Sequence, residues 1–187
     1  MHFLGRLTTL PEKWMPTLNF IASLLHDSPA SAHGFSIHSI CQAGKPFGLI
    51  AGKWMGPYAI CRAFEVLGDQ HLEGLLKIVT VDSGGGVPCL DEDRLVQHFK
   101  PRPATRQELY LWPDRVSTQT GLLILLPVVL GVDRLNEVYS EQLQTILRLP
   151  QSVGIVGGKP GHSLYFIGYQ VHLRRVFVLA DVWVTSP

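Results

Sequence analysis

The order of helical and extended segments constrains the fold of this chain more than any other feature. Apolar residues recur at helical spacing in the first third, which predicts helices at residues 14–25, 35–42 and 58–67. Apolar and β-branched runs come later and predict strands at residues 75–81, 121–130, 152–156, 163–169 and 175–180. Between them we expect short helices at residues 94–99 and 140–147. Helices followed by consecutive strands predict an α+β domain with a mostly antiparallel sheet.

Individual residues set the expected ends of these segments. Pro57 suits the first position of a helix, and Gly68 is expected to end the same helix. Ser140 is expected to act as the N-cap of the later helix. The apolar run Leu122–Leu130, interrupted by Pro127, is too short for the roughly 20 residues of a membrane helix. It predicts a strand buried on both faces.

Composition excludes several classes of protein. The chain has 187 residues, 46% of them hydrophobic and 17% charged, which fits one domain over residues 1–187 with a sizeable core. The net charge of +1 argues against nucleic acid and against an anionic membrane as partner, because both demand clustered cations. Three cysteines without a Cys-x-x-Cys pair support neither a disulfide framework nor a zinc ribbon. They fit a reduced, cytoplasmic setting.

The glycine-rich stretch from Ile155 to Gly161 is the most unusual segment of the chain. A strand followed by glycines and a lysine is similar to a phosphate-binding loop. However, no Ser or Thr follows Lys159, and a strand is expected next, so no helix dipole would face a phosphate. A tight hairpin with glycines at positive φ is the favoured interpretation.

Residues with reactive side chains do not form a recognisable site along the sequence. Cys61 lies inside the helix that starts at Pro57, among apolar neighbours, which predicts an inert buried thiol. His162 and His172 could each act as a base, although surface or capping roles are more common, and His33 with His38 lacks a third metal ligand. By itself, Trp54 before Gly-Pro is expected to be a core or partly buried aromatic rather than part of a groove.

Taken together, several segments resemble one family, the autophagin cysteine proteases, also called autophagy-related protein 4. The longest of them is Pro-Gln-Ser-Val-Gly-Ile-Val-Gly-Gly-Lys-Pro at residues 150–160, which continues into Ser-Leu-Tyr-Phe-Ile-Gly-Tyr at 163–169. The others occupy residues 35–38, 42–44, 51–62 and 125–131, with Leu135-Asn136 and Tyr139. The resemblance covers about residues 24–169 and leaves 170–187 as a divergent tail.

This resemblance implies a papain-like fold and a defined reaction. The family trims a ubiquitin-like modifier of the autophagy-related protein 8 family after a C-terminal glycine, and releases it from phosphatidylethanolamine. The chemistry would be thiolate attack, an acyl-enzyme and hydrolysis, without a cofactor. The residues corresponding to Trp54 and to the loop Gly157, Gly158, Lys159 and Pro160 cover the substrate groove in the family. An indole opposite a proline leaves a slot for a glycine tail, and the loop glycines allow the loop to lift.

The sequence departs from the family at the reacting residues. The family nucleophile lies in a Gly-Trp-Gly-Cys segment, and the family acid and base lie in an Asp-Pro-His segment; neither occurs in this chain. Asp181 and His172 are therefore not assigned to catalysis. The resemblance stops abruptly at Gln170, which indicates an incomplete copy, namely a truncated, alternatively spliced or mispredicted product. We expect the chain to be inactive alone, the alternative being a non-catalytic remnant that binds the modifier.

Overall fold

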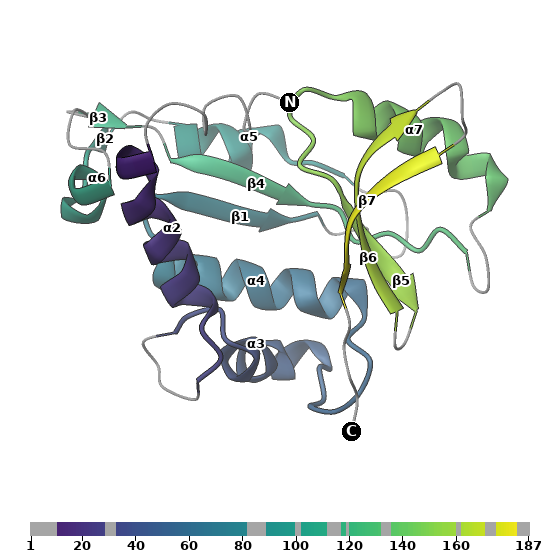
Figure 1. Ribbon diagram of the computed structural model, residues 1–187, viewed down its shortest axis with the longest axis horizontal. Helices are drawn as coiled ribbons and strands as arrows, with labels where there is room; N and C mark the ends of the chain where they lie inside the picture. Colours follow the sequence, from purple (N-terminus) through teal and green to yellow (C-terminus); the bar gives the residue numbers. More distant parts are fainter. Residues whose placement is uncertain are drawn as a thin grey trace. The chain divides into compact units, whose positions relative to one another are not determined.

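A computed structural model describes nine ranges of the chain and divides it into two compact units. The described residues are 11–28, 33–81, 89–99, 102–111, 117–118, 120–131, 136–159, 162–170 and 175–182. The first unit comprises residues 1–128 and the second residues 129–187. Helices and small sheets occur together (Figure 1), which confirms the mixed α+β class.

The first unit contains the helices α2 to α6 and the strands β1 to β4. Its helices are α2 (Pro11–Leu25), α3 (Ile37–Gly44), α4 (Pro57–His71), α5 (Glu92–Val96) and α6 (Arg106–Leu111). Single 3-10 turns follow α3 and α5, namely η1 (Lys45–Phe47) and η2 (Gln97–Phe99). Its strands are β1 (Leu76–Thr80), β2 (Arg102–Pro103), β3 (Ser117–Thr118) and β4 (Gly121–Leu125). The helix α6 and the strands β2 and β3 were not expected from the sequence.

The helix α4 and the strand β1 form the centre of this unit. β1 pairs with β4 in parallel, from Leu76 opposite Gly121 to Thr80 opposite Leu125, while the short β2 and β3 are antiparallel. α4 packs on β1, and α3 packs on α4. Among the described residues, the buried apolar ones are Leu49, Ala59, Ala63, Leu67, Leu72, Ile78, Val79, Val81 and Leu111. The core therefore lies between one amphipathic helix and the face of β1.

Several expected boundaries in this unit differ from those of the structure, and two of the differences have a clear physical cause. α4 begins at Pro57 as expected, but it continues past Gly68 to His71. Gly68 faces the strand, and a Cβ there would come within 3.0 Å of Ile78 side-chain carbons, so the glycine permits close helix–strand packing instead of ending the helix. β4 ends at Leu125, two residues before Pro127, and Ile124 is 36% exposed, so this strand is not buried on both faces.

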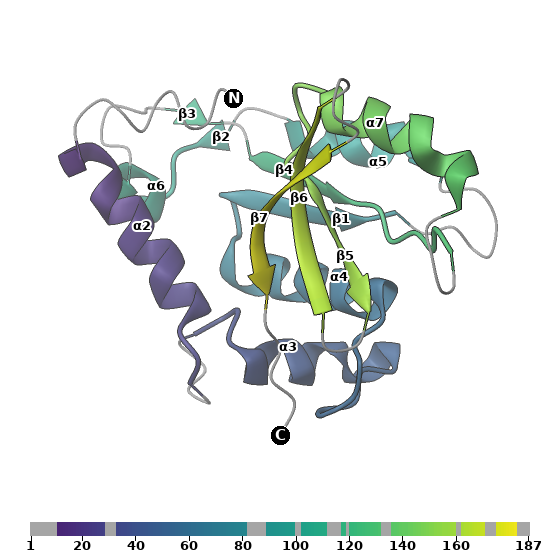
Figure 2. The ribbon, with the colours of Figure 1, turned by 45° about the vertical axis from the view of Figure 1, so that its right-hand side comes forward.

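The second unit holds the glycine-rich segment in a three-stranded sheet. Its elements are η3 (Glu137–Tyr139), α7 (Ser140–Arg148), β5 (Ile155–Lys159), β6 (His162–Gln170) and β7 (Arg175–Val182). The strands lie in the antiparallel order β5–β6–β7, side by side in Figure 2, and α7 packs against β6. The N-cap expected at Ser140 is wrong: Tyr139 occupies that position, and Asn136 caps η3 by accepting from the Val138 N–H at 3.1 Å.

The expectation that glycines of the 155–161 stretch have positive φ is wrong for Gly157 and Gly158. β5 begins at Ile155, three residues after the expected start, because Gly154 has a φ of +130° that interrupts the extended chain. Gly157 and Gly158 lie within β5, opposite Leu164 and Ser163, and are not among the described glycines with positive φ. The hydroxyl of Tyr165 donates to the carbonyl of Val153, which ties the segment before β5 to β6.

Candidate functional site

Trp54 stands in the segment that leads into α4. The residue before the helix, Gly56, is extended and acts as the N-cap, and Pro57 occupies the first helical turn. The Trp54 side chain is 47% exposed. An indole of that exposure is not a core residue, and its position at a helix entrance is compatible with a groove wall.

The glycine-rich segment forms one arm of a hairpin in the second unit. Gly157, Gly158 and Lys159 pair with Leu164, Ser163 and His162 of β6. Pro160, the fourth residue assigned to this loop by the family resemblance, lies outside the described residues. Trp54 belongs to the first unit and the hairpin to the second. Their facing arrangement across a groove therefore stays a prediction.

All three cysteines are free thiols. Cys61 lies in the second turn of α4, where burial raises the pKa of its thiol to about 11. A thiolate is the reactive form of cysteine, so this position disfavours a nucleophile. Cys41 is half-buried in α3, and Cys89 is exposed just before α5.

We expect Cys89 to be alkylated well before Cys61. At pH 8, a thiol with a pKa of about 11 is ionised to roughly one part in a thousand. Iodoacetamide labelling, followed site by site with mass spectrometry, should modify Cys89 first, and Cys61 should follow only as the pH approaches 11 or in denaturant. Because the unfolded thiol ionises near pH 9, the free energy of unfolding should fall between about pH 9 and 11. Equal labelling of both thiols at pH 8 would contradict this assignment.

Two of the described histidines, His26 and His33, lie close together, with their ring centroids 4.6 Å apart. The Nδ1 of His38 lies 3.3 Å from the Asp27 carboxylate in an exposed pair, and Nδ1 of His33 lies 2.7 Å from the Ser23 carbonyl oxygen. His162 begins β6, and His172 lies outside the described residues. Within the described ranges, no group of three His, Cys, Asp or Glu side chains could hold a metal ion, and no helix is long and apolar enough to cross a membrane.

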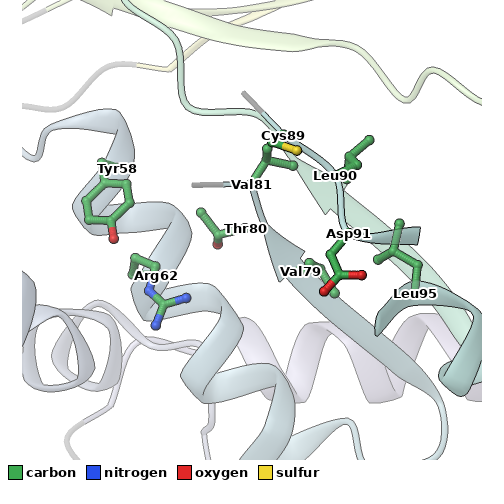
Figure 3. A pocket seen from close by; sticks show the side chains of 9 residues that line it. All are labelled: Tyr58, Arg62, Val79, Thr80, Val81, Cys89, Leu90, Asp91 and Leu95. Atoms are coloured by element: carbon green, nitrogen blue, oxygen red, sulfur yellow. The ribbon is translucent and has the colours of Figure 1, made fainter. Parts of the chain in front are cut away.

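A cleft of about 350 Å³ opens at the carboxyl end of β1. We call it the β1-end cleft; it is lined by Tyr58, Arg62, Val79, Thr80, Val81, Cys89, Leu90, Asp91 and Leu95. Figure 3 shows Tyr58 and Arg62 of α4 on one side, and the segment from Cys89 to Leu95 on the other. The end of β1 forms the floor between them. Ligands of α/β folds bind outside the carboxyl ends of parallel strands, which is where this cleft lies.

Polar groups of the cleft are organised around one buried carboxylate. Glu65 is 6% exposed, and its Oε2 accepts from Nη1 of Arg62 at 2.7 Å and from the backbone N–H of Thr80 at 3.3 Å. The Arg62 guanidinium also lies over the Phe47 ring, 5.1 Å from its centroid. Within the part of the chain that the structure describes, Nε of Arg62 and Oγ1 of Thr80 are buried without a hydrogen-bond partner. Sequence reasoning missed this cleft, although the Arg62–Glu65 spacing of three residues is a visible helix-pair signal.

A second buried carboxylate, Glu108, fixes the start of α6. Its two oxygens accept from Nη1 and Nη2 of Arg102, each at 2.8 Å, and the hydrogen bond raises the pKa of Arg102. Oε2 of Glu108 also accepts from the backbone N–H and from the hydroxyl of Thr105. In return, the hydroxyl oxygen of Thr105 accepts from the backbone N–H of Glu108 at 3.2 Å. This is a capping box joined to a bidentate ion pair. It borders an open cavity of about 590 Å³.

Comparison with known proteins places the chain in a family. The profile of the peptidase C54 catalytic domain matches residues 2–179. Cysteine protease ATG4A of Oryza sativa subsp. japonica is 37% identical, over 90% of this chain and 37% of its own length. Cysteine protease ATG4 of Medicago truncatula is 40% identical, over 80% of this chain and 31% of its own length. Cysteine protease ATG4a of Arabidopsis thaliana is 36% identical, over 90% of this chain and 37% of its own length.

The matched range extends beyond the motifs at 24–169 on both sides. The chain spans between three and four tenths of the length of these curated relatives. Because the profile covers nearly the whole sequence, the chain belongs to the peptidase C54 family of ATG4 cysteine proteases.

Proposed function

We propose that this chain forms the substrate groove of an autophagy cysteine protease. Its substrate would be a ubiquitin-like modifier of the autophagy-related protein 8 family, trimmed after a C-terminal glycine and released from phosphatidylethanolamine. The observation that carries the proposal is the match of the peptidase C54 catalytic domain over residues 2–179. Three free cysteines suit a reducing compartment, so we place this activity in the cytoplasm.

The proposed role of the chain is to admit and hold the modifier tail. The half-exposed Trp54 would form one wall of a slot. The segment Gly157, Gly158, Lys159 and Pro160, named by the family resemblance, would form the other. Only a tail without side chains passes such a slot, which selects for glycine. Holding the tail in one geometry would position its carbonyl for attack by a thiolate, and the acyl-enzyme would then be hydrolysed without a cofactor.

The reacting groups themselves are not assigned to residues of this chain. The family's Gly-Trp-Gly-Cys and Asp-Pro-His segments do not occur among the 187 residues. Cys61 is an unsuitable substitute, because its pKa of about 11 leaves it protonated at neutral pH. We therefore propose that the isolated chain binds the modifier without cutting it. A non-catalytic modifier-binding protein is the second candidate function, and the inert Cys61 thiol favours it over cleavage by this chain alone.

One assay with two readouts tests these proposals. The purified chain is mixed with a C-terminally tagged modifier; cleavage is followed on a gel and binding by calorimetry. We expect binding without cleavage, and we expect Trp54→Ala to weaken binding about 30-fold, the scale of a tryptophan hot spot. Tyr110→Ala, which removes a 71% exposed aromatic of α6, is the matched control and should bind normally.

The outcomes separate the two candidates. Cleavage by the isolated chain would overturn the proposal that it is inactive alone. Unchanged binding after Trp54→Ala would remove Trp54 from the groove. Addition of the two family segments in a longer chain should restore cleavage if the chain is part of the protease, and should leave it absent if the chain only binds.

A further inference from the structure

The β1-end cleft contains buried polar atoms that find no hydrogen-bond partner among the described residues. Thr80 is 4% exposed, and its Oγ1 has no hydrogen-bond partner. Nε of Arg62, on the neighbouring wall, is also buried without a partner. Native proteins pair nearly all such groups, and each exception costs stability. Two exceptions lining one cleft therefore call for a ligand that supplies their partners.

The charges around the cleft indicate which ligand fits. The Arg62 cation is already offset by the buried Glu65 carboxylate at 2.7 Å, and Asp91 adds a carboxylate on the opposite side. An anion would gain little from an arginine whose charge is already compensated. A neutral group with an acceptor on one side and a donor on the other matches better.

A backbone amide has this arrangement of acceptor and donor. Its carbonyl oxygen can accept from Nε of Arg62 and the hydroxyl of Thr80, and its N–H can donate to the Asp91 carboxylate, which has several acceptor positions. The remaining lining is apolar, contributed by Val79, Val81, Leu90 and Leu95, and offers space for an aliphatic side chain. A volume of about 350 Å³ is at the small end of ligand pockets.

We propose that the β1-end cleft binds an extended peptide segment of a partner protein through one backbone amide and its aliphatic side chain. The inference goes beyond the proposed function, because it uses neither Trp54 nor the glycine hairpin. Since Oγ1 of Thr80 and Nε of Arg62 are not open to water, binding requires side chains around them to rearrange, and Arg62 itself is 30% exposed. Side-chain motions of this kind are fast, on the order of nanoseconds.

The probe for the test is N-acetyl-L-leucine N-methylamide, which carries the amide groups and one aliphatic side chain. Titration into the 187-residue chain should shift the NMR signals of the Thr80 and Val81 amides and of the Arg62 Nε–H. A probe of this size should have a Kd on the order of millimolar. The anions 4-methylpentanoate, which keeps the aliphatic chain but has no amide, and inorganic phosphate should bind at least about fivefold more weakly, the effect of one mismatched polar contact. Tighter binding of either anion, or no shift at roughly 50 mM probe, would overturn the proposal.

Two substitutions at one position provide the matched control. Thr80→Val keeps the shape and removes the hydroxyl, whereas Thr80→Ser keeps the hydroxyl. We expect Thr80→Val to weaken probe binding about five- to tenfold and, because an unpaired buried hydroxyl is removed, to raise the melting temperature. Thr80→Ser should bind like the parent chain. Unchanged binding in Thr80→Val contradicts the proposal, and so does a lower melting temperature, which would show that the hydroxyl has a partner within the protein.

Discussion

Glu108→Gln is expected to lower the free energy of unfolding by about 3 to 5 kcal/mol, the usual effect of removing one partner of a buried ion pair. The carboxylate is 2% exposed and receives both terminal nitrogens of Arg102 as well as the N–H and hydroxyl of Thr105. Glutamine has one acceptor oxygen and no charge. Arg102 would therefore lose the negatively charged partner of its ion pair, and the N-terminal cap of α6 would weaken. Since domains are stable by only about 5–15 kcal/mol, this loss is large. Urea denaturation followed by circular dichroism measures it.

An exposed ion pair of the same unit supplies the control for Glu108. Asp69 accepts from Nζ of Lys77 at 2.5 Å, but its side chain is 52% exposed. Removal of that charge by Asp69→Asn should cost less than about 1 kcal/mol, because water screens exposed pairs. If both substitutions had equal effects, burial would not be the reason that Glu108 matters.

Gly158→Ala is expected to disrupt the hairpin of β5 and β6, whereas Gly157→Ala should be tolerated. A Cβ at residue 158 would overlap the carbonyl oxygen of His162 and lie 2.8 Å from Cα of Ser163, so the backbone itself would have to move. A Cβ at residue 157 would meet only Phe166, at 3.8 Å, which is an ordinary contact. Overpacking of the first kind costs about 1–3 kcal/mol or more. The second change restricts the unfolded chain and can add up to about 1 kcal/mol.

Hydrogen exchange distinguishes these two glycines. In Gly158→Ala, backbone amides of β6 near Ser163 should exchange faster than in the parent chain, and modifier binding should weaken because the hairpin changes shape. In Gly157→Ala, exchange and binding should stay close to those of the parent. Equal protection in both variants would mean that residue 158 is not held against β6 as described, and would remove the steric requirement for glycine at this position.

Much of the secondary structure could be predicted from the sequence, because it depends on local patterns. Apolar spacing located α2, α4 and α7 within a few residues, and β-branched runs located β1, β6 and β7. Pro57 was correctly expected in the first helical turn, since its fixed φ suits that position. The family was also identified from the sequence, because long segments of specific residues such as 150–169 carry it.

Features that depend on contacts between distant residues required the tertiary structure. The parallel pairing of β1 with β4 joins segments separated by residues 81–120, and no local pattern sets that register. Gly68 looked like a helix end until its contact with Ile78 gave it a packing role. Glu108 and Thr80 are ordinary polar residues in the sequence. Folding removes water from both residues, so each depends on the hydrogen-bond partners that the protein provides. The partners of Glu108 determine its effect on stability. The buried hydroxyl of Thr80 is the basis of the proposed binding.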